Sequence, residues 1–242
     1  MLFRSSGNNT LDGGAGNDSL NGGAGNDSYI VNASGDTVTE NAAEGTDSVQ
    51  SSVSFSLGAN VENLSLTGGG VNGLNIDGNG NALNNVITGN SGNNTLTSGG
   101  GVDTLQGGGG NDTLVASDVS NLAQADGGLG ADVLRLTATS ASFDMSTLIN
   151  VGFNIETLDL RNGSNGNVSF NSLTLTSLSD ANRDLTLQLD NGDTFNLSGS
   201  TSTAALSSGT NGDGSRYADY AVYATADQTG PAESTLHIYW GP

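Results

Sequence analysis

The sequence predicts an all-β solenoid built from short strands and tight turns. Three observations predict it: a nine-residue repeat, an apolar residue at one fixed position, and an acidic or amide residue at another. Internal periodicity of this kind indicates coils that stack on one another and share a continuous core. Of the 242 residues, 38 are glycine. Because many of these glycines recur in phase, the composition indicates a repeat architecture rather than disorder.

The first block of repeats contains two nearly identical neighbours. Residues 13–21 read GGAGNDSLN and residues 22–30 read GGAGNDSYI. Residues 4–12 and 31–39 are degenerate copies, and GTDSVQ at 45–50 keeps the second half of the repeat after a two-residue insertion. The shared pattern is GGxGxD followed by x-apolar-x.

A second block begins at Gly80. It contains four consecutive copies, at 80–88, 89–97, 98–106 and 107–115. Residues 116–126 interrupt the block before a last copy, GGLGADVLR, at 127–135.

Each position of the repeat has a physical reading. Glycines at positions one, two and four permit positive φ angles and close approach of neighbouring backbones. The resulting tight turn points its carbonyl groups at a common centre, and the aspartate at position six adds an anionic oxygen. Calcium accepts six to eight oxygen ligands at about 2.3–2.6 Å in tolerant geometry. Stacked turns therefore predict several Ca²⁺ ions, each held between neighbouring coils.

The candidate calcium ligands follow from the spacing. If two nonapeptides make one coil, position-six residues two repeats apart lie on the same side and share an ion. The expected pairs are Asp18 with Asp36, Asp27 with Asp47 or Asn9, Asn94 with Asp112, and Asn85 with Asp103. The asparagine sites should be weaker because they lack the charge. The full set of candidate ligands is Asn9, Gly13, Gly14, Ala15, Gly16, Asp18, Gly22, Gly23, Ala24, Gly25, Asp27, Asp36, Asp47, Asn85, Asn94, Gly99, Gly101, Asp103, Gly107, Gly109, Gly110, Asp112, Gly127 and Asp132.

The apolar residue at position eight is expected to point inward from a three-residue strand. The predicted core residues are Leu11, Leu20, Tyr29, Val38, Val49, Ile87, Leu96, Leu105, Leu114 and Leu134.

The composition indicates that a metal is needed to hold this core together. One inward side chain per nine residues cannot offset a backbone ordering cost of about 1–2 kcal/mol per residue. The chain has a formal net charge of −20 and no cysteine, so aligned carboxylates would repel and no disulfide could staple them. A glycine-rich solenoid without metal is the alternative reading, and these two arguments count against it.

The nonapeptides resemble those of the RTX (repeats-in-toxin) family of type I secreted bacterial proteins. Residues 35–68 also resemble an inter-repeat segment common in that family, so the resemblance covers residues 4–135. It implies a right-handed parallel β-roll with calcium ions between turns, calcium-dependent folding outside the cell, and export by an uncleaved signal at the extreme C-terminus.

Two regions are expected. Residues 4–135 form the roll, interrupted at about 51–79 and 116–126, and residues 136–242 form a β-rich C-terminal cap with the secretion signal region. Short alternating strands are expected in the second region at 156–160, 168–170, 173–175, 184–190 and 193–199.

The last strands allow two readings. Residues 217–240 resemble the terminal segment of large RTX adhesins, although the ending Trp240-Gly241-Pro242 departs from the family pattern. The alternative is a terminal β-hairpin that packs Tyr220, Tyr223, Ile238 and Trp240 on the cap; both readings can hold.

The charge balance argues against several classes of partner. There are 25 acidic residues, five arginines and no lysine, so neither nucleic acid nor an anionic membrane surface is an expected partner. We find no apolar stretch long enough to span a bilayer, and residues 1–6 do not resemble a cleavable signal peptide. The expected location is secreted, extracellular or on the bacterial cell surface.

Catalytic chemistry is not expected. His237 is the only histidine, so a catalytic triad would depend on it alone, and His/Cys zinc sites are excluded by count. The five arginines are scattered along the sequence with no evident cluster. Glu40, Glu44 and Glu62 are candidate extra ligands where the roll is interrupted.

The sequence therefore predicts a non-catalytic calcium-binding module. It is expected to drive extracellular folding and type I secretion of a larger protein, an adhesin, with the type I secretion machinery as partner. The alternatives are an adhesive module that binds a glycan or a surface, and an accessory module of a secreted polysaccharide-active enzyme. The sequence does not predict an oligomeric state.

Overall fold

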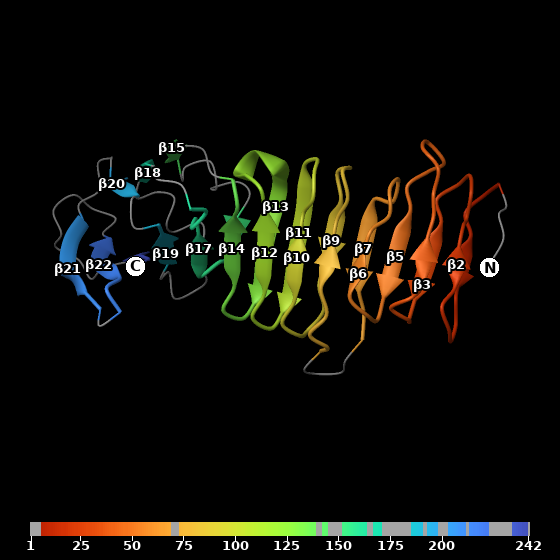
Figure 1. Ribbon diagram of the computed structural model, residues 1–242, viewed down its shortest axis with the longest axis horizontal. Helices are drawn as coiled ribbons and strands as arrows, with labels where there is room; N and C mark the ends of the chain where they lie inside the picture. The colour runs from red at the N-terminus through yellow and green to blue at the C-terminus, as the bar shows by residue number, and fades with distance from the viewer. Residues whose placement is uncertain are drawn as a thin grey trace.

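The computed structural model describes residues 6–68, 73–138, 142–144, 152–163, 167–170, 185–190, 193–197, 203–211, 213–222 and 234–241. These residues form an elongated all-β solenoid with the N-terminus at one end (Figure 1). The part up to about residue 135 is called the roll below, and one coil is one full turn of the solenoid.

One main sheet has eight strands, all paired in parallel. In spatial order they are β1 (Thr10–Asp12), β3 (Ser28–Val31), β5 (Ser48–Ser51), β7 (Asn63–Leu66), β9 (Val86–Thr88), β11 (Asp103–Gly109), β13 (Leu122–Leu129) and β16 (Gly152–Phe153). Alternate strands of the chain thus lie side by side, as expected if two nonapeptides make one coil.

The second main sheet has ten strands. In spatial order they are β6 (Phe55–Ser56), β8 (Gly78–Asn79), β10 (Thr95–Thr97), β12 (Thr113–Ala116), β14 (Val133–Leu136), β17 (Thr157–Asp159), β19 (Leu185–Leu189), β23 (Ser234–Trp240), β22 (Arg216–Val222) and β21 (Thr203–Thr210). Smaller parallel sheets join β2 (Ser19–Leu20) to β4 (Thr37–Val38), and β15 (Ser142–Asp144), β18 (Asn167–Phe170) and β20 (Thr194–Leu197) to one another.

The core is made of two rows of inward side chains, one from each main sheet. In the first row Leu11 is in register with Tyr29, and Tyr29 with Val49. In the second, Leu96 is in register with Leu114, and Leu114 with Leu134. All ten residues predicted at position eight are buried, which confirms that part of the sequence analysis.

The coils continue through both predicted interruptions. Within 51–79, strand β7 belongs to the eight-stranded sheet, and β6 and β8 belong to the ten-stranded sheet. Leu64 and Leu66 of β7 supply buried side chains although no nonapeptide is present. Within 116–126, a 3₁₀ turn (η1, Val119–Asn121) precedes β13, and the pairing with β11 shifts register beside Asp103. Loss of the nonapeptide therefore changes the length of a coil without ending the solenoid: Asn63 pairs with Ser48, which is 15 residues earlier, and with Val86, which is 23 residues later.

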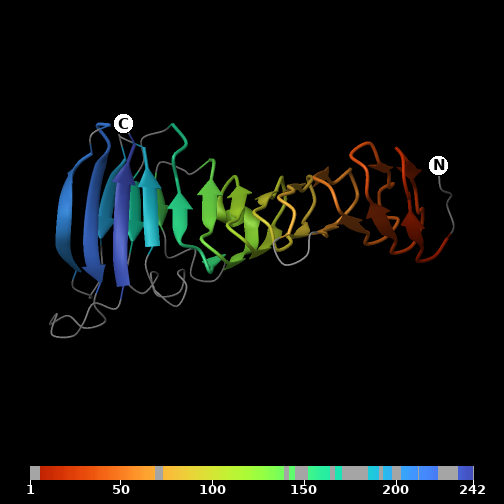
Figure 2. The same ribbon diagram turned by 90° about the horizontal axis from the view of Figure 1, so that it is seen from below.

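The C-terminal strands close one end of the ten-stranded sheet. Strand β19 pairs with β23 in parallel, and β22 pairs antiparallel with both β23 and β21. Figure 2 shows these blue strands at the end opposite the N-terminus. The antiparallel β22–β23 pair corresponds to the terminal hairpin in the sequence analysis, with Ile238 buried.

Four of the five strands predicted after residue 135 correspond to β17, β18, β19 and β20. The fifth, at 173–175, lies outside the described residues, as do the side chains of Tyr220, Tyr223 and Trp240. The boundary between roll and cap at 135/136 stays a prediction. No helix within the described ranges is long and apolar enough to cross a membrane.

Candidate metal centre

The turns owe their shape to glycines at positions two and four. Gly23 and Gly25 have φ angles of 86° and 130°, and Gly108 and Gly110 have 103° and 101°. Side chains with a Cβ are disfavoured at such angles, so these positions favour glycine.

Of the two reasons expected for the glycine at position one, only the close approach of neighbouring groups applies. Gly22, Gly107 and Gly127 do not have positive φ angles, so the expectation of backbone freedom was wrong there. Instead, a Cβ at each of them would collide with the aspartate at position six of the same turn. Position one is therefore glycine because the aspartate side chain occupies that space and, at Gly107 and Gly127, because a backbone carbonyl of the neighbouring coil does so as well.

The position-six residues form ladders along the roll. In each step the backbone N–H of one coil donates a hydrogen bond to the position-six carboxylate of the next coil. The nitrogen-to-oxygen distances are 2.6 Å for Asn9 to Asp27, 2.9 Å for Asp18 to Asp36, 2.7 Å for Asp27 to Asp47, 2.7 Å for Asn85 to Asp103, 2.7 Å for Asn94 to Asp112 and 2.7 Å for Asp112 to Asp132. Each pair expected to share an ion is thus adjacent in space; such an adjacent pair is called a rung below.

The second carboxylate oxygen of several rungs has no protein partner. Among the described residues, Oδ2 of Asp27, Asp103, Asp112 and Asp132 is buried without any hydrogen bond. A buried carboxylate oxygen without a partner is costly unless a cation or proton satisfies it. The residues present therefore fit a hard cation held between the turns.

Comparison with known families identifies the repeat. A model of the RTX calcium-binding nonapeptide repeat matches residues 4–38 and 79–114, in four copies. The two matched segments are therefore RTX calcium-binding nonapeptide repeats. No curated protein and no solved structure matches the chain.

These repeats bind Ca²⁺, and the several copies here imply several ions. Their role is structural, and RTX repeat proteins are typically secreted. The assignment of individual residues as ligands stays a prediction. The glycines and alanines named as candidate ligands can serve only through their backbone carbonyls. Gly107 and Gly109 lie at the end of β11 and Gly127 lies in β13, whereas the others lie between strands.

Burial makes the RTX carboxylates hard to ionise without metal. It raises the pKa of Asp112 to about 6, and the charge of Asp132 adds to this, while the hydrogen bond from the Asn94 backbone opposes it. Burial also raises the pKa of Asp103 and of Asp132. An ion that neutralises these groups stabilises the folded roll in particular.

Asp36 has a different environment. Burial would raise its pKa, but backbone N–H groups of Asp18, Ala33 and Asn32 outweigh burial and hold the pKa below its ordinary value. Its Oδ2 accepts from Asn32 and Ala33 at 3.1 Å. Asp36 is thus stabilised as a carboxylate by its own turn.

The asparagines at position six close the turn with their amides. Oδ1 of Asn94 accepts from the backbone of Asn90 at 2.8 Å, and Nδ2 donates to the carbonyl of Ile76 at 2.7 Å. Asn85 accepts from Asn81 in the same way and donates to the carbonyls of Val61 and Glu62. Both oxygen and nitrogen are engaged, which is consistent with weaker metal binding at these two residues.

Two glutamates continue the ladders where no aspartate is available. The Asp47 backbone donates to Glu62 at 2.7 Å, and the Asp132 backbone donates to Glu156 at 2.6 Å. The sequence analysis included Glu62 as a candidate but missed Glu156. Like the position-six aspartates, Glu156 stands two residues before an inward leucine, and this spacing could have identified it.

Two arginines also come together, contrary to the sequence analysis. Arg135 of β14 and Arg161 after β17 both donate from Nε to Asp159, at 2.9 and 2.8 Å. Burial would raise the pKa of Asp159, but these guanidinium groups outweigh burial and hold it below its ordinary value. The register that places Arg135 beside Asp159 brings the arginines together.

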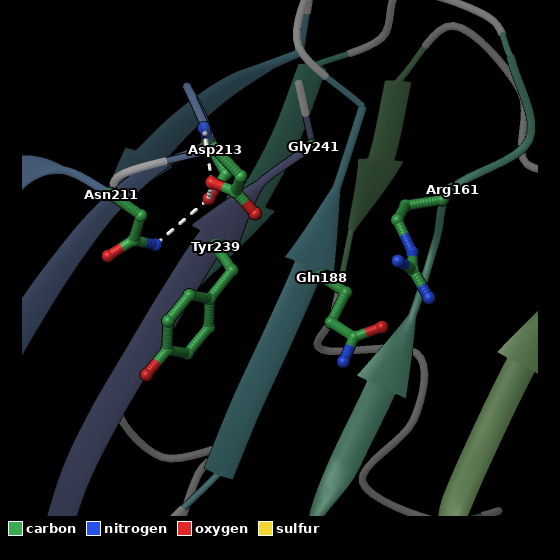
Figure 3. A pocket seen from close by; sticks show the side chains of 7 residues that line it. Arg161, Gln188, Asn211, Asp213, Tyr239 and Gly241 are labelled. Carbon is green, nitrogen blue, oxygen red and sulfur yellow. Dashed lines mark hydrogen bonds between the residues drawn. The ribbon is translucent and has the colours of Figure 1, made fainter.

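The outer face near the C-terminus carries a polar hollow of about 320 Å³. In Figure 3, Tyr239 of β23 and Arg161 lie on opposite sides of Gln188 of β19. The lining residues are Arg161, Gln188, Asn211, Asp213, Ser215, Tyr239 and Gly241. His237, the one histidine of the chain, lies on β23 in register with Thr186.

Proposed function

We propose that this chain is a non-catalytic module whose calcium-driven folding outside the cell supports type I secretion of a larger protein. The observation that carries the proposal is the set of buried Oδ2 atoms on Asp27, Asp103, Asp112 and Asp132 that have no partner within the described part of the chain. At neutral pH, a fold that leaves these oxygens unsatisfied is stabilised when a cation binds.

The physical mechanism is a coupling between ion concentration and folding. In a cytosol with little free calcium, the aligned carboxylates repel and the chain stays unfolded, which suits passage through a narrow channel. Outside the cell, millimolar calcium exceeds the about 10⁻⁴–10⁻³ M dissociation constants typical of extracellular modules. Binding to the folded state alone stabilises it by about 1.4 kcal/mol per site at a tenfold excess over Kd, and several sites add to one another.

This coupling between calcium binding and folding would favour movement of the chain out of the cell over its return. In the RTX type I route implied by the resemblance, the C-terminus emerges first. Coils that fold on the outside would then hinder return of the chain and provide a template for the coils that follow.

The test is a calcium titration of the full chain followed by far-ultraviolet circular dichroism. We expect a disordered spectrum in excess chelator and a β-rich spectrum in millimolar calcium. A β-rich spectrum in excess chelator at neutral pH would contradict the proposal. For export, we expect residues 136–242 fused to a passenger to direct secretion by type I machinery, and retention of the passenger would count against that part.

A second candidate function is adhesion through a glycan. The hollow beside Tyr239 supports it, because an aromatic ring that is 39% exposed sits among planar amide, guanidinium and carboxylate groups. Such a combination suits stacking and hydrogen bonding of a sugar ring. A glycan array on the calcium form tests it: we expect hits that Tyr239→Ala removes, and an array without hits favours the folding module alone.

A further inference from the structure

The second coil departs from the repeat by two residues, Glu40 and Asn41. The turn after them keeps the backbone of the repeat, because Ala43 has the positive φ of position two (62°) and Gly45 that of position four (156°). The Gly25 backbone donates to the carbonyl of Glu44 as the Gly7 backbone donates to that of Ala24. Glu40 is therefore an added residue before the turn, and no nonapeptide position accounts for it.

Glu40 lies inside the roll, beside a rung. The exposed fractions of Asp27, Glu40 and Asp47 are 2%, 5% and 1%. Each of the three contributes a carboxylate oxygen that lies within 4.8 Å of the other two. We call these three residues the Glu40 cluster.

Tyr29 fixes the position of Glu40. It is a tyrosine at the inward position where other copies have leucine, isoleucine or valine. Its hydroxyl accepts a hydrogen bond from the Gly22 backbone at 2.8 Å and donates to Oε1 of Glu40. The phenol thus holds the glutamate at the rung with one oxygen and leaves the other available.

The remaining oxygens of the cluster are unsatisfied. Oδ1 of Asp27 and Oδ1 of Asp47 accept backbone N–H groups of the neighbouring coil. Oε2 of Glu40 and Oδ2 of Asp27 are buried and have no hydrogen-bond partner among the described residues. Two buried oxygens, from two different residues of the cluster, therefore have no proton or cation from the described residues to satisfy them.

The cluster carries three formal negative charges. Burial and, to a smaller extent, the charges of Asp47 and Asp27 raise the pKa of Glu40 to about 7. Burial, Glu62 and Asp27 raise the pKa of Asp47. The described arginines, Arg135, Arg161 and Arg216, lie from β14 onward and are not placed to neutralise this coil.

We propose that Asp27, Glu40 and Asp47 form a three-carboxylate calcium site that binds more tightly than the aspartate rungs and fills first. This rests on the proposed calcium-dependent folding. Calcium suits the cluster because every donor is a hard oxygen, and the number of charged ligands is one of the factors that set calcium affinity. Among the described residues, no third carboxylate lies this close to a rung such as Asp112 with Asp132.

Tyr29 allows this site to be observed separately. Terbium(III) replaces calcium at oxygen sites and emits when a nearby tyrosine or tryptophan transfers excitation energy to it. The other tyrosines and Trp240 fall at residues 217–240, and strands β22 and β23 lie at the opposite end of the solenoid from β3 (Figure 1). Emission that Tyr29→Phe abolishes therefore comes from terbium at the Glu40 cluster.

The experiment titrates the full chain with terbium and compares the wild type with Glu40→Gln. We expect tyrosine-sensitised emission at low terbium in the wild type, and a midpoint shifted upward about tenfold or more in Glu40→Gln. The matched control is Glu44→Gln, which removes the same charge from a partly exposed residue of the same loop. Its midpoint should remain within a factor of about two to three of the wild type, as for weakly coupled surface charges.

The outcomes separate this inference from the proposed function. Equal midpoints for Glu40→Gln and the wild type, or emission that survives Tyr29→Phe, would overturn the site. If circular dichroism shows calcium-driven folding in all variants while these midpoints are equal, the inference alone fails. If the wild type does not fold with calcium at all, the proposed function fails as well.

Discussion

Replacement of Asp112 by asparagine should stabilise the metal-free roll and weaken the calcium-bound one. Asp112 is 1% exposed, its Oδ2 has no partner within the described ranges, and burial raises its pKa to about 6 from an ordinary value of 3.8. This difference corresponds to about 3 kcal/mol that the ionised carboxylate costs the folded state at neutral pH. Asparagine has no such cost, and Asn94 of the preceding coil shows that an amide fits a position-six site.

The assay measures both states of the chain. In chelator at pH 7.5, folding is induced with trimethylamine N-oxide, which favours compact states, and is followed by circular dichroism. Asp112→Asn should fold at a lower osmolyte concentration, with up to about 3 kcal/mol of added stability. In saturating calcium, urea unfolding should show a smaller calcium-induced gain than in the wild type, because one anionic ligand is lost.

The control is Asp77→Asn, which removes the same charge from an exposed residue that accepts from the Thr95 backbone at 2.8 Å. Its effect in chelator should stay within about 0.5 kcal/mol, as for most surface substitutions. Lower stability of Asp112→Asn than of the wild type in chelator, together with an undiminished gain from calcium, would refute the reasoning.

Three further perturbations test the ladder and the core. In chelator, folding should be favoured at pH 4–5 and lost as pH rises through 6–7. The reason is that Asp112 and Glu40 have folded-state pKa values of about 6 and about 7, above their ordinary values, so protonation favours the folded state. Circular dichroism that shows more structure at pH 7.5 than at pH 5 would contradict this. In calcium, Gly108→Ala should lower the free energy of unfolding by about 1–3 kcal/mol because Gly108 has a φ of 103°. Gly109→Ala should lower it little, because a Cβ there meets nothing nearer than 3.7 Å. Equal urea midpoints for the two variants would be inconsistent with the turn geometry. Leu105→Ala should cost about 2–5 kcal/mol by urea unfolding because the side chain is fully buried, and a loss under 1 kcal/mol would argue against a closed core.

The periodic part of the fold could be predicted from the sequence because a separation of 18 residues equals one coil. Asp18 and Asp36, or Asn94 and Asp112, are 18 residues apart and are joined by the ladder as expected. The inward residues followed from the same phase.

Contacts between coils could not be predicted where the coil length changes. Asp132 and Glu156 are 24 residues apart, so counting in nines could not join them. The pairing of Arg135 with Asp159, also 24 residues on, was missed for the same reason.

The steric role of the glycine at position one was also beyond the sequence. Positive φ and crowding both select glycine, and only the geometry shows that Gly22 and Gly107 are small to make room for a carboxylate. Similarly, the hydrogen bond between Tyr29 and Glu40 could not be predicted, because a tyrosine at position eight cannot be distinguished from an ordinary core residue by sequence.

Crystals of the full chain grown in calcium would decide where the cohesion of the roll comes from. Anomalous difference maps should show calcium between the stacked turns, beside Oδ2 of Asp27, Asp103, Asp112 and Asp132, at about 2.3–2.6 Å from the ligand oxygens. An intact roll with only water or nothing at those four positions, in crystals soaked in millimolar calcium, would contradict the account.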